Sequence, residues 1–338
     1  MKKMKRKYGV VLVGCGHIGE QHIRDIYFRE QIHIVGVVDI DPKRAQEFRV
    51  KYGAESCGTD YREYLQRSDV DIVIIATYVS THLAILRDCL QNGKHVLCEK
   101  PIGRTEEEGR EFIRLVRSSP CRVLVGHILR YNETYRRAAE LIHSGAIGRL
   151  TLIRMVQNHH SKNWPRYRRL LEDCSPIVDC GVHYIDVMQW FTGEKVINVD
   201  GFGGKIDDDL PEAVYNYGVI NVRFPSGCIG YYEAGWSQNL SSCNVKEFVG
   251  SSGRLTITLN ANRAQDVEEG DLIRLYRNDT NEYTTINCPS KYKNMWAQMQ
   301  RLIAMIENGE PAVPSIDEIE SAFCIAMRAD EAIRKKGI

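Results

Sequence analysis

The segment GCGHIG at residues 14–19 constrains the fold of this chain more than any other feature. It directly follows an apolar run, Tyr8–Val13, and it opens a helix-like stretch, Glu20–Arg29. A second apolar run ends at Asp39, about 20 residues after Gly19. A strand, a glycine-rich turn, a helix and a second strand ending in an acid form the βαβ unit that can hold a dinucleotide. The alternative, a glycine-rich turn with no ligand, leaves this order unexplained.

Each glycine of this turn has a separate steric task. Gly14 permits the tight turn after the strand, Gly16 lets a pyrophosphate approach the backbone, and Gly19 lets helix and strand pack closely. The first turn of the helix also offers backbone N–H groups and a partial positive charge to the phosphates. We therefore predict cofactor contacts along the whole turn, from Gly14, Cys15, Gly16, His17, Ile18 and Gly19.

Asp39, at the end of the second strand, predicts which dinucleotide binds. Its carboxylate can accept hydrogen bonds from both hydroxyls of the adenosine ribose, whereas a 2′-phosphate there would meet like charge. The sequence therefore favours NAD(H) over NADP(H). Lys43 and Arg44 lie close in the sequence and would soften the rejection of a 2′-phosphate, so NADP(H) stays open.

The first third of the chain alternates strand-like and helix-like stretches with short breaks. Helix-like stretches such as Thr81–Gln91 and Thr105–Arg117 separate runs that are almost continuously apolar. Apolar strands separated by helices predict a parallel sheet covered on both faces, which is a doubly wound α/β domain of the Rossmann type. The predicted strands are Tyr8–Val13, His33–Val38, Asp71–Thr77, His95–Cys98 and Arg122–Gly126.

Residues 179–186 read DCGVHYID and carry two acids and a histidine at helical spacing. Asp179, His183 and Asp186 would share one side of a helix beside an apolar stripe. Ionisable groups in such a place are costly unless they are paired or used. This pattern alone fits a surface ion pair, a core histidine or a proton-transfer site.

Further motifs occur along the chain, and their order is informative. They are Ala76-Thr77 followed by His82, then Glu99-Lys100-Pro101, RYNETY from Arg130, GAIGRL from Gly145, and FPSGCIG from Phe224. Together with the glycine turn and DCGVHYID, they make the chain resemble the glucose–fructose oxidoreductase/inositol dehydrogenase/MocA family over nearly its whole length.

The resemblance implies roles for individual residues. In such enzymes the lysine of the EKP motif and an Asp-x-x-x-His pair flank the carbinol carbon of a sugar or cyclitol. Here Lys100 would stabilise alkoxide charge, His183 would accept the hydroxyl proton, and Asp179 would orient the imidazole. Pro101 is expected to follow a cis peptide bond. Cofactor contacts would extend to Ala76, Thr77, His82, Glu99 and Lys100, and no metal is needed.

The resemblance also implies a second domain built on a large, mostly antiparallel sheet that assembles homodimers or homotetramers. From Leu150 onward polar and apolar residues alternate, which indicates one face packed on helices and one face open to another subunit. We expect a Rossmann domain over residues 1–126, an α+β substrate-binding and oligomerisation domain over 127–293, and C-terminal helices over 294–338 that pack back toward the first domain.

Four residues are candidates for substrate contacts: Arg130, Asn158, Trp164 and Asp186. Trp164 lies in a basic stretch and could stack on a sugar ring, although a solvated basic loop explains the stretch equally well. Arg130 follows the fifth strand, where the two domains should meet. Asp186 could bind a substrate hydroxyl or pair with a neighbour. The adjacent His159 and His160 would point to opposite faces of a strand, which argues against a shared metal ion.

The composition narrows the partners and the compartment. The formal net charge is +1, whereas nucleic-acid binders usually carry a basic surplus. The eleven cysteines show no CxxC pair and no metal-ligand spacing, and free thiols in that number are typical of a reducing cytoplasm. No apolar run approaches bilayer length, and the basic start, MKKMKRK, is expected to be a solvated leader. We therefore expect a cytoplasmic protein without nucleic-acid or membrane partners.

These features predict an NAD(H)-dependent oxidoreductase that transfers a hydride between the nicotinamide and a secondary alcohol of a sugar, sugar derivative or cyclitol. Two alternatives stay open. The redox step can be transient, because oxidation at one carbon acidifies the neighbouring C–H and permits glycoside cleavage or elimination. The chain can also be a non-catalytic dinucleotide-binding regulator, although a regulator has no need of Lys100, Asp179 and His183 together.

Overall fold

The computed structural model describes residues 6–260, 270–289 and 291–337, so most of the basic start lies outside the described residues. The chain divides into two compact units. Unit 1 contains residues up to 128 together with residues 293–316, and unit 2 contains residues 129–292 together with the rest of the C-terminal segment.

Unit 1 contains a six-stranded sheet in the order β3-β2-β1-β4-β5-β6, in which every neighbouring pair is parallel. The predicted doubly wound domain is thereby confirmed. The strand order reverses beside β1, and ligands of such sheets bind at this reversal, outside the carboxyl ends of the strands. The strands are β1 (Tyr8–Val13), β2 (Ile32–Val38), β3 (Ser56–Gly58), β4 (Ile72–Ile75), β5 (His95–Cys98) and β6 (Val123–Val125).

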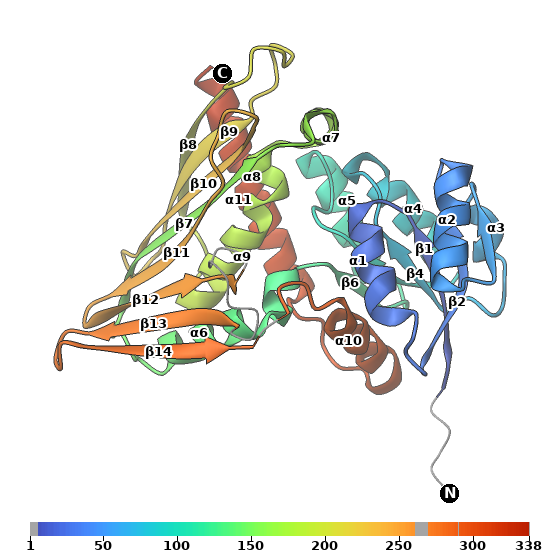
Figure 1. Cartoon of the computed structure of the whole chain (residues 1–338), viewed down its shortest axis with the longest axis horizontal. Coiled ribbons are helices and arrows are strands. Elements are labelled where there is room, and N and C mark those ends of the chain that lie inside the picture. The colour runs from blue at the N-terminus through green and yellow to red at the C-terminus, as the bar shows by residue number, and fades with distance from the viewer. Residues whose placement is uncertain (1–5, 261–269, 290, 338) are drawn as a thin grey trace, which may run out of the picture. The chain divides into compact units, whose positions relative to one another are not determined.

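Helices connect these strands, and local sequence sets their ends. Asp41 caps α2 by accepting hydrogen bonds from the backbone N–H groups of Lys43 and Arg44, and Gly53 ends that helix with a φ of 66°. α1 and α10 contact each other, so the C-terminal part of the chain supplies one helix to this unit (Figure 1). The helices are α1 (His17–Ile26), α2 (Pro42–Tyr52), α3 (Arg62–Leu65), α4 (Val79–Gln91), α5 (Glu106–Ser118) and α10 (Met295–Asn308).

Unit 2 contains an eight-stranded sheet in the order β14-β13-β12-β11-β7-β10-β9-β8. Only β7 and β10 pair in parallel; the other described neighbours are antiparallel, which confirms the predicted mostly antiparallel sheet. The strands are β7 (Leu150–His160), β8 (Asn198–Gly204), β9 (Tyr217–Arg223), β10 (Ile229–Ser237), β11 (Cys243–Gly250), β12 (Gly253–Thr258), β13 (Asp271–Arg277) and β14 (Glu282–Cys288).

One face of the large sheet is covered by helices (Figure 1). Glycines allow this close packing, because a Cβ on Gly218 would lie 2.6 Å from Ile177, one on Gly230 2.6 Å from Met188, and one on Gly203 2.5 Å from Ile333. These side chains come from three different helices, which therefore rest directly on the strands. The helices of this unit are α6 (Glu133–His143), α7 (Trp164–Asp173), α8 (Pro176–Asp179), α9 (Gly181–Thr192) and α11 (Ile316–Lys335).

Two segments differ from what we expected. The stretch weighed above as a basic loop forms α7, because Asn163 caps its first turn and a proline occupies one of the first helical positions. In the C-terminal segment only α10 belongs to unit 1; α11 belongs almost entirely to unit 2. There Asp330 accepts a hydrogen bond from Ser175 at 2.6 Å and Ile333 packs on β8. Within the described ranges, no helix combines the length and apolar character that a bilayer crossing needs.

Candidate active site

The glycine turn after β1 has the shape that a dinucleotide requires. Gly14 has a φ of 98°, and a Cβ on it would lie 2.4 Å from the carbonyl oxygen of Ala76. A Cβ on Gly19 would lie 1.9 Å from the carbonyl oxygen of Gly14. By contrast, a Cβ on Gly16 would meet nothing within 4 Å. Gly14 and Gly19 are therefore required by the protein itself, whereas Gly16 leaves space that a phosphate group fits.

The start of α1 is open to an anion. Gly16 is the N-cap, so no side chain caps the first N–H groups of the helix. His17 is exposed and Ile18 is partly exposed at this end. Backbone N–H groups of a helix N-terminus, with the helix dipole behind them, bind phosphate. The residues of the turn thus fit the pyrophosphate of NAD.

Asp39, directly after β2, supports this turn. Its Oδ2 accepts a hydrogen bond from the backbone N–H of Cys15 at 2.8 Å, and its Oδ1 accepts one from Asp41 at 2.9 Å. Arg44 lies 3.9 Å from Asp39. The thiol of Cys15 is buried, which raises its pKa to about 12, so this residue contributes its backbone rather than a thiolate.

The loops after β4 and β5 carry the other predicted cofactor contacts. Ala76 and Thr77 follow β4, and Glu99, Lys100 and Pro101 follow β5, with a cis peptide bond before Pro101 as expected. His82 is fully buried in α4, with Nδ1 3.0 Å from the carbonyl oxygen of Pro101 and Nε2 3.2 Å from that of Thr77. His82 therefore links the two loops.

Asp179 and His183 lie at a break between two helices. We expected one continuous helix, but α8 ends at Asp179 and α9 begins at Gly181. Ser175 caps α8 and also bonds Asp330 of α11, which fixes this segment on the unit. From Ile177 to Met188 only Asp179 and His183 are partly exposed, while the other residues are buried. A polar pair that stays accessible on a buried segment can exchange a proton with a ligand.

Arg130 and Asp186, two predicted substrate contacts, bond to each other. Both oxygens of Asp186 accept hydrogen bonds from the guanidinium of Arg130, at 2.7 and 2.8 Å. The Arg130 side chain is 6% exposed and that of Asp186 1%. Arg130 also contacts Glu318 at 3.0 Å and lies over the ring of Trp190. This bidentate pair holds η1 (Ile128–Tyr131) against α9, so each of the two charges has a buried protein partner.

Asn158 and Trp164, the other two candidates, also have protein partners. Asn158 donates a hydrogen bond to Glu233 at 2.6 Å, on the face of the sheet opposite the helices. The indole N–H of Trp164 donates to Asp209 at 2.8 Å, and the residue is 8% exposed. Side chains alternate between the two faces along β7, so Gln157 and His159 point to the helix-covered face. The ring of His159 contacts Tyr167 of α7. The apolar residues Ile153 and Met155 lie at the same two-residue spacing along β7 and are buried. They could have identified this face from the sequence.

Lys246 on β11 is a buried basic side chain that sequence reasoning missed. Its ammonium group donates to the carbonyl oxygens of Val156 and Val245 and to the amide of Asn244, and it lies 4.5 Å from the ring centre of Tyr184. Burial lowers the pKa of Lys246 to about 7. A lysine inside a strand is usually read as exposed, and none of the motifs or candidate residues described above lies in β11.

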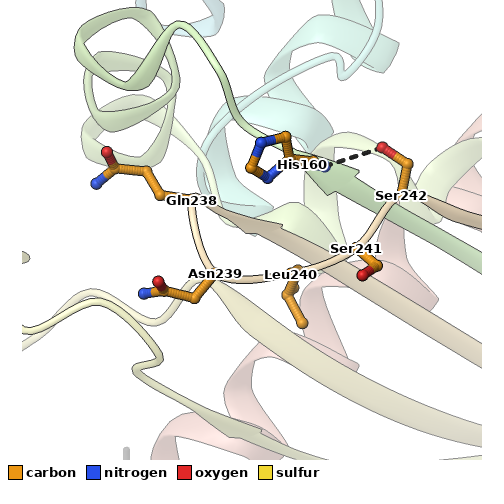
Figure 2. Close-up of a pocket in the computed structure, with 6 residues that line it drawn as sticks. All are labelled: His160, Gln238, Asn239, Leu240, Ser241 and Ser242. Atoms are coloured by element: carbon orange, nitrogen blue, oxygen red, sulfur yellow. Dashed lines mark hydrogen bonds between the residues drawn. The ribbon is translucent and has the colours of Figure 1, made fainter.

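An open polar hollow of about 430 Å³ lies at the turn between β10 and β11. Figure 2 shows this turn curving around His160, whose backbone N–H donates a hydrogen bond to Ser242 at 3.2 Å. His160 and His159 lie in different surroundings, as strand alternation predicts. The hollow is lined by His160, Gln238, Asn239, Leu240, Ser241 and Ser242. Among the described residues, no group of three or more His, Cys, Asp and Glu side chains is placed to hold a metal ion.

Two family models match the chain. Residues 8–127 match the model described as the oxidoreductase family GFO_IDH_MocA with an NAD-binding Rossmann fold. Residues 135–256 match the model of the GFO/IDH/MocA C-terminal domain. The first match contains the glycine turn and the loops after β4 and β5, and the second contains the break between α8 and α9.

Individual relatives agree with these matches. Inositol 2-dehydrogenase of Burkholderia lata is 33% identical over 191 residues, 55% of this chain and 55% of that protein. The chain thus aligns with about half the length of this relative. Myo-inositol 2-dehydrogenase of Thermotoga maritima is 22% identical over 335 residues, 96% of each chain. The crystal structure of myo-inositol 2-dehydrogenase from Lactobacillus plantarum has a TM-score of 0.82 at 20% identity, with 98% of each chain covered, which shows a shared fold.

Proposed function

The chain belongs to the GFO/IDH/MocA family of oxidoreductases, and from this premise we propose that it is an NAD(H)-dependent dehydrogenase acting on a secondary alcohol of a cyclitol or sugar. The observation that carries the proposal is the glycine turn, which leaves space for a phosphate at Gly16 alone. The relatives named as inositol dehydrogenases support the cyclitol among the possible substrates.

The proposed chemistry divides between hydride and proton. Bound NAD⁺ supplies the acceptor for the hydride of the carbinol carbon. His183 takes the hydroxyl proton, because its imidazole is partly exposed on an otherwise buried segment and imidazole is the commonest general base of proteins. Asp179 supports the imidazolium that forms, and Lys100 stabilises the alkoxide that develops on the substrate oxygen. In the reverse direction His183 returns the proton to the carbonyl oxygen.

NAD(H) is the proposed cofactor, with NADP(H) as the weaker one. Asp39 is almost buried and accepts two backbone hydrogen bonds, so its carboxylate is fixed where a 2′-phosphate would need to sit. Arg44, 3.9 Å away, partly neutralises this charge. We therefore expect NAD(H) to bind more tightly than NADP(H), but by a modest factor.

Assembly through the open face of the large sheet is part of the proposal. This face carries the exposed side chains of Leu152, Phe202, Ile229 and Tyr283, and Leu152 and Ile229 are direct neighbours in register. Exposed apolar groups on a sheet of this size favour association with a second copy. We propose a homodimer or homotetramer in the cytoplasm, where the eleven free thiols would stay reduced.

The test is a panel of cyclitols, sugars and glycosides incubated with NAD⁺ or NADP⁺, followed at 340 nm and by analysis of products. The proposal predicts accumulation of NADH with an oxidised cyclitol or sugar. Cleavage of a glycoside without accumulation of NADH would instead support transient redox chemistry. Binding of NADH without turnover of any member, from a preparation that binds the cofactor stoichiometrically, would favour a non-catalytic regulator. Light scattering at micromolar concentration gives the oligomeric state, and a monomer there would contradict the assembly.

A further inference from the structure

A buried polar network of unit 2 is attached to α8, the one-turn helix that ends at Asp179. Ser175 is the N-cap of this helix, and its Oγ accepts a hydrogen bond from the backbone N–H of Val178 at 3.2 Å. The backbone carbonyl of Ser175 accepts a second bond, from the N–H of Asp179 at 2.9 Å. A four-residue helix has few bonds of its own, so these two contacts hold much of its backbone. The position of Asp179 therefore depends on Ser175.

The hydroxyl of Ser175 can cap α8 because its own proton has a partner elsewhere. It donates to Oδ1 of Asp330 on α11 at 2.6 Å, and the hydroxyl of Tyr215 donates to the same oxygen. Burial and the charge of Asp330 raise the pKa of Tyr215 well above its ordinary value, so the phenol keeps its proton. Oδ2 of Asp330 accepts from Arg334 at 2.6 Å. Asp330 thus holds the Ser175 proton away from α8, and a lone pair of Oγ faces Val178.

Two glycines of the large sheet make room for this network. Gly203 of β8 and Gly218 of β9 are direct neighbours in register, so the sheet lacks two adjacent side chains here. A Cβ on Gly203 would lie 3.2 Å from the ring of Tyr215, and one on Gly218 would lie 3.3 Å from it. Ser175, Tyr215 and Asp330 are each at most 7% exposed. Water has little access to these three polar groups, so they must satisfy one another.

We propose that Ser175 is a positioning residue for Asp179 and is held in its capping orientation by Asp330. The role of Asp179 in proton transfer rests on the proposed function, but the dependence of its backbone on Ser175 and Asp330 does not. Without the Ser175 hydroxyl, the N–H of Val178 loses its partner and the single turn of α8 opens more often. Without Asp330, the Ser175 hydroxyl turns its proton toward another acceptor, and the cap weakens. In either case Asp179 leaves the place from which it supports His183.

The first experiment measures the opening of α8 in the full chain, without cofactor or substrate. Hydrogen exchange of the Asp179 and Cys180 amides, followed by mass spectrometry with fragmentation, reports how often the helix opens. In Ser175→Ala we expect both amides to exchange about tenfold faster, which is the size of effect that loss of a capping side chain produces. Asp330→Ala should accelerate the same amides by less, because the capping oxygen stays in place.

Tyr215→Phe is the matched control, because it also removes one buried hydroxyl from Asp330 but leaves the bond between Ser175 and Asp330 in place. It should lower the melting temperature and leave the exchange of the two α8 amides unchanged. Unchanged exchange of these amides in a folded Ser175→Ala protein would overturn the proposal. Equal acceleration in Ser175→Ala and Tyr215→Phe would also overturn it, since the effect would then follow the loss of any hydroxyl from the network.

A second experiment asks whether the opening of α8 reaches turnover through Asp179. Ser175→Ala should lower kcat about tenfold at an unchanged dissociation constant for NADH, as expected for a misplaced reacting group. The same substitution added to Asp179→Ala should cause no further loss, because the side chain that Ser175 positions is then absent. A further tenfold loss in that background would overturn the proposal. If the unmodified protein turned over no substrate, the proposed function would fail, and hydrogen exchange alone would decide whether Ser175 and Asp330 position Asp179.

Discussion

The glycine turn of unit 1 and the α8–α9 segment of unit 2 are the two places where chemistry is expected, and they use different atoms. In the turn the missing side chains matter, because a Cβ on Gly14 or Gly19 would overlap a carbonyl oxygen. In the α8–α9 segment the side chains of Asp179 and His183 matter, and neighbouring residues are buried to hold them. A site made of backbone restricts the sequence at fixed positions, whereas a site made of side chains depends on partners distant in sequence.

Gly19→Ala and Gly16→Ala should affect the glycine turn in different ways. Gly19→Ala places a methyl group 1.9 Å from the carbonyl oxygen of Gly14, so the backbone must shift. We expect the largest effect here, a loss of roughly 4 kcal/mol or more in the free energy of unfolding together with loss of NADH binding. Gly16→Ala meets nothing within 4 Å and should weaken NADH binding at unchanged melting temperature.

The measurement is a fluorescence titration with NADH beside a thermal melt of each variant. Gly16→Ala that binds NADH as tightly as the unmodified protein would mean that no phosphate approaches the backbone at this position. The two variants together separate the glycine that the fold needs from the glycine that the ligand needs.

Arg130→Met should destabilise unit 2 and leave turnover per folded molecule unchanged. It leaves Asp186, 1% exposed, without its bidentate partner, and removing one member of a buried ion pair costs about 3–5 kcal/mol. We expect a lower free energy of unfolding in urea, with turnover per folded molecule preserved. Arg130→Met combined with Asp186→Leu should recover much of the lost stability. A variant that melts normally but loses turnover would return Arg130 to the substrate site.

The contrast between these regions also explains what the sequence could predict. The parallel sheet and the glycine turn were foreseen, because local patterns determine both of them. The cis bond before Pro101 was expected from the resemblance to the family. The partners of Arg130, Asn158 and Trp164 were not foreseen, since Asp186, Glu233 and Asp209 lie 45 or more positions away in the chain. A polar residue near a motif is thus a poor guide to ligand contact until its protein partners are known.

Lys246 is a useful comparison with Arg130, because both are buried basic side chains. Arg130 bonds carboxylates, whereas the described partners of Lys246 are neutral carbonyl and amide oxygens. The pKa of Lys246 is lowered to about 7 by burial, so between about pH 7 and pH 10 the unfolded chain binds a proton that the folded chain does not. Stability must then rise with pH by about 1.4 kcal/mol per unit in that window. We expect Lys246→Met to remove this rise, measured as urea unfolding at pH 7.5 and 9.5. Equal pH dependence in both proteins would show that Lys246 stays charged when buried.

Asp39→Asn should have the smallest effect. This effect should be confined to the choice between NAD(H) and NADP(H). The amide keeps an oxygen that can accept from the N–H of Cys15 but loses the charge that repels a 2′-phosphate. We expect the ratio of the dissociation constants for NADPH and NADH to fall by about tenfold, or about 1.4 kcal/mol. Arg44→Ala, which removes the nearby cation, should move the ratio the other way. Equal or better use of NADP⁺ by the unmodified protein would contradict the assignment of Asp39.

The central claim is that the backbone of the glycine turn binds the cofactor and that side chains of the α8–α9 segment transfer the proton. It is tested most directly by His183→Ala, with turnover and NADH affinity measured on the same preparation. Turnover should fall by on the order of 10²–10⁴, equivalent to about 3–5 kcal/mol of barrier, because the variant lacks its general base. The dissociation constant for NADH should stay the same, since the glycine turn and Asp39 hold the cofactor. A His183→Ala protein that melts early but keeps its turnover per folded molecule would contradict this account and make Asp179 and His183 a structural pair.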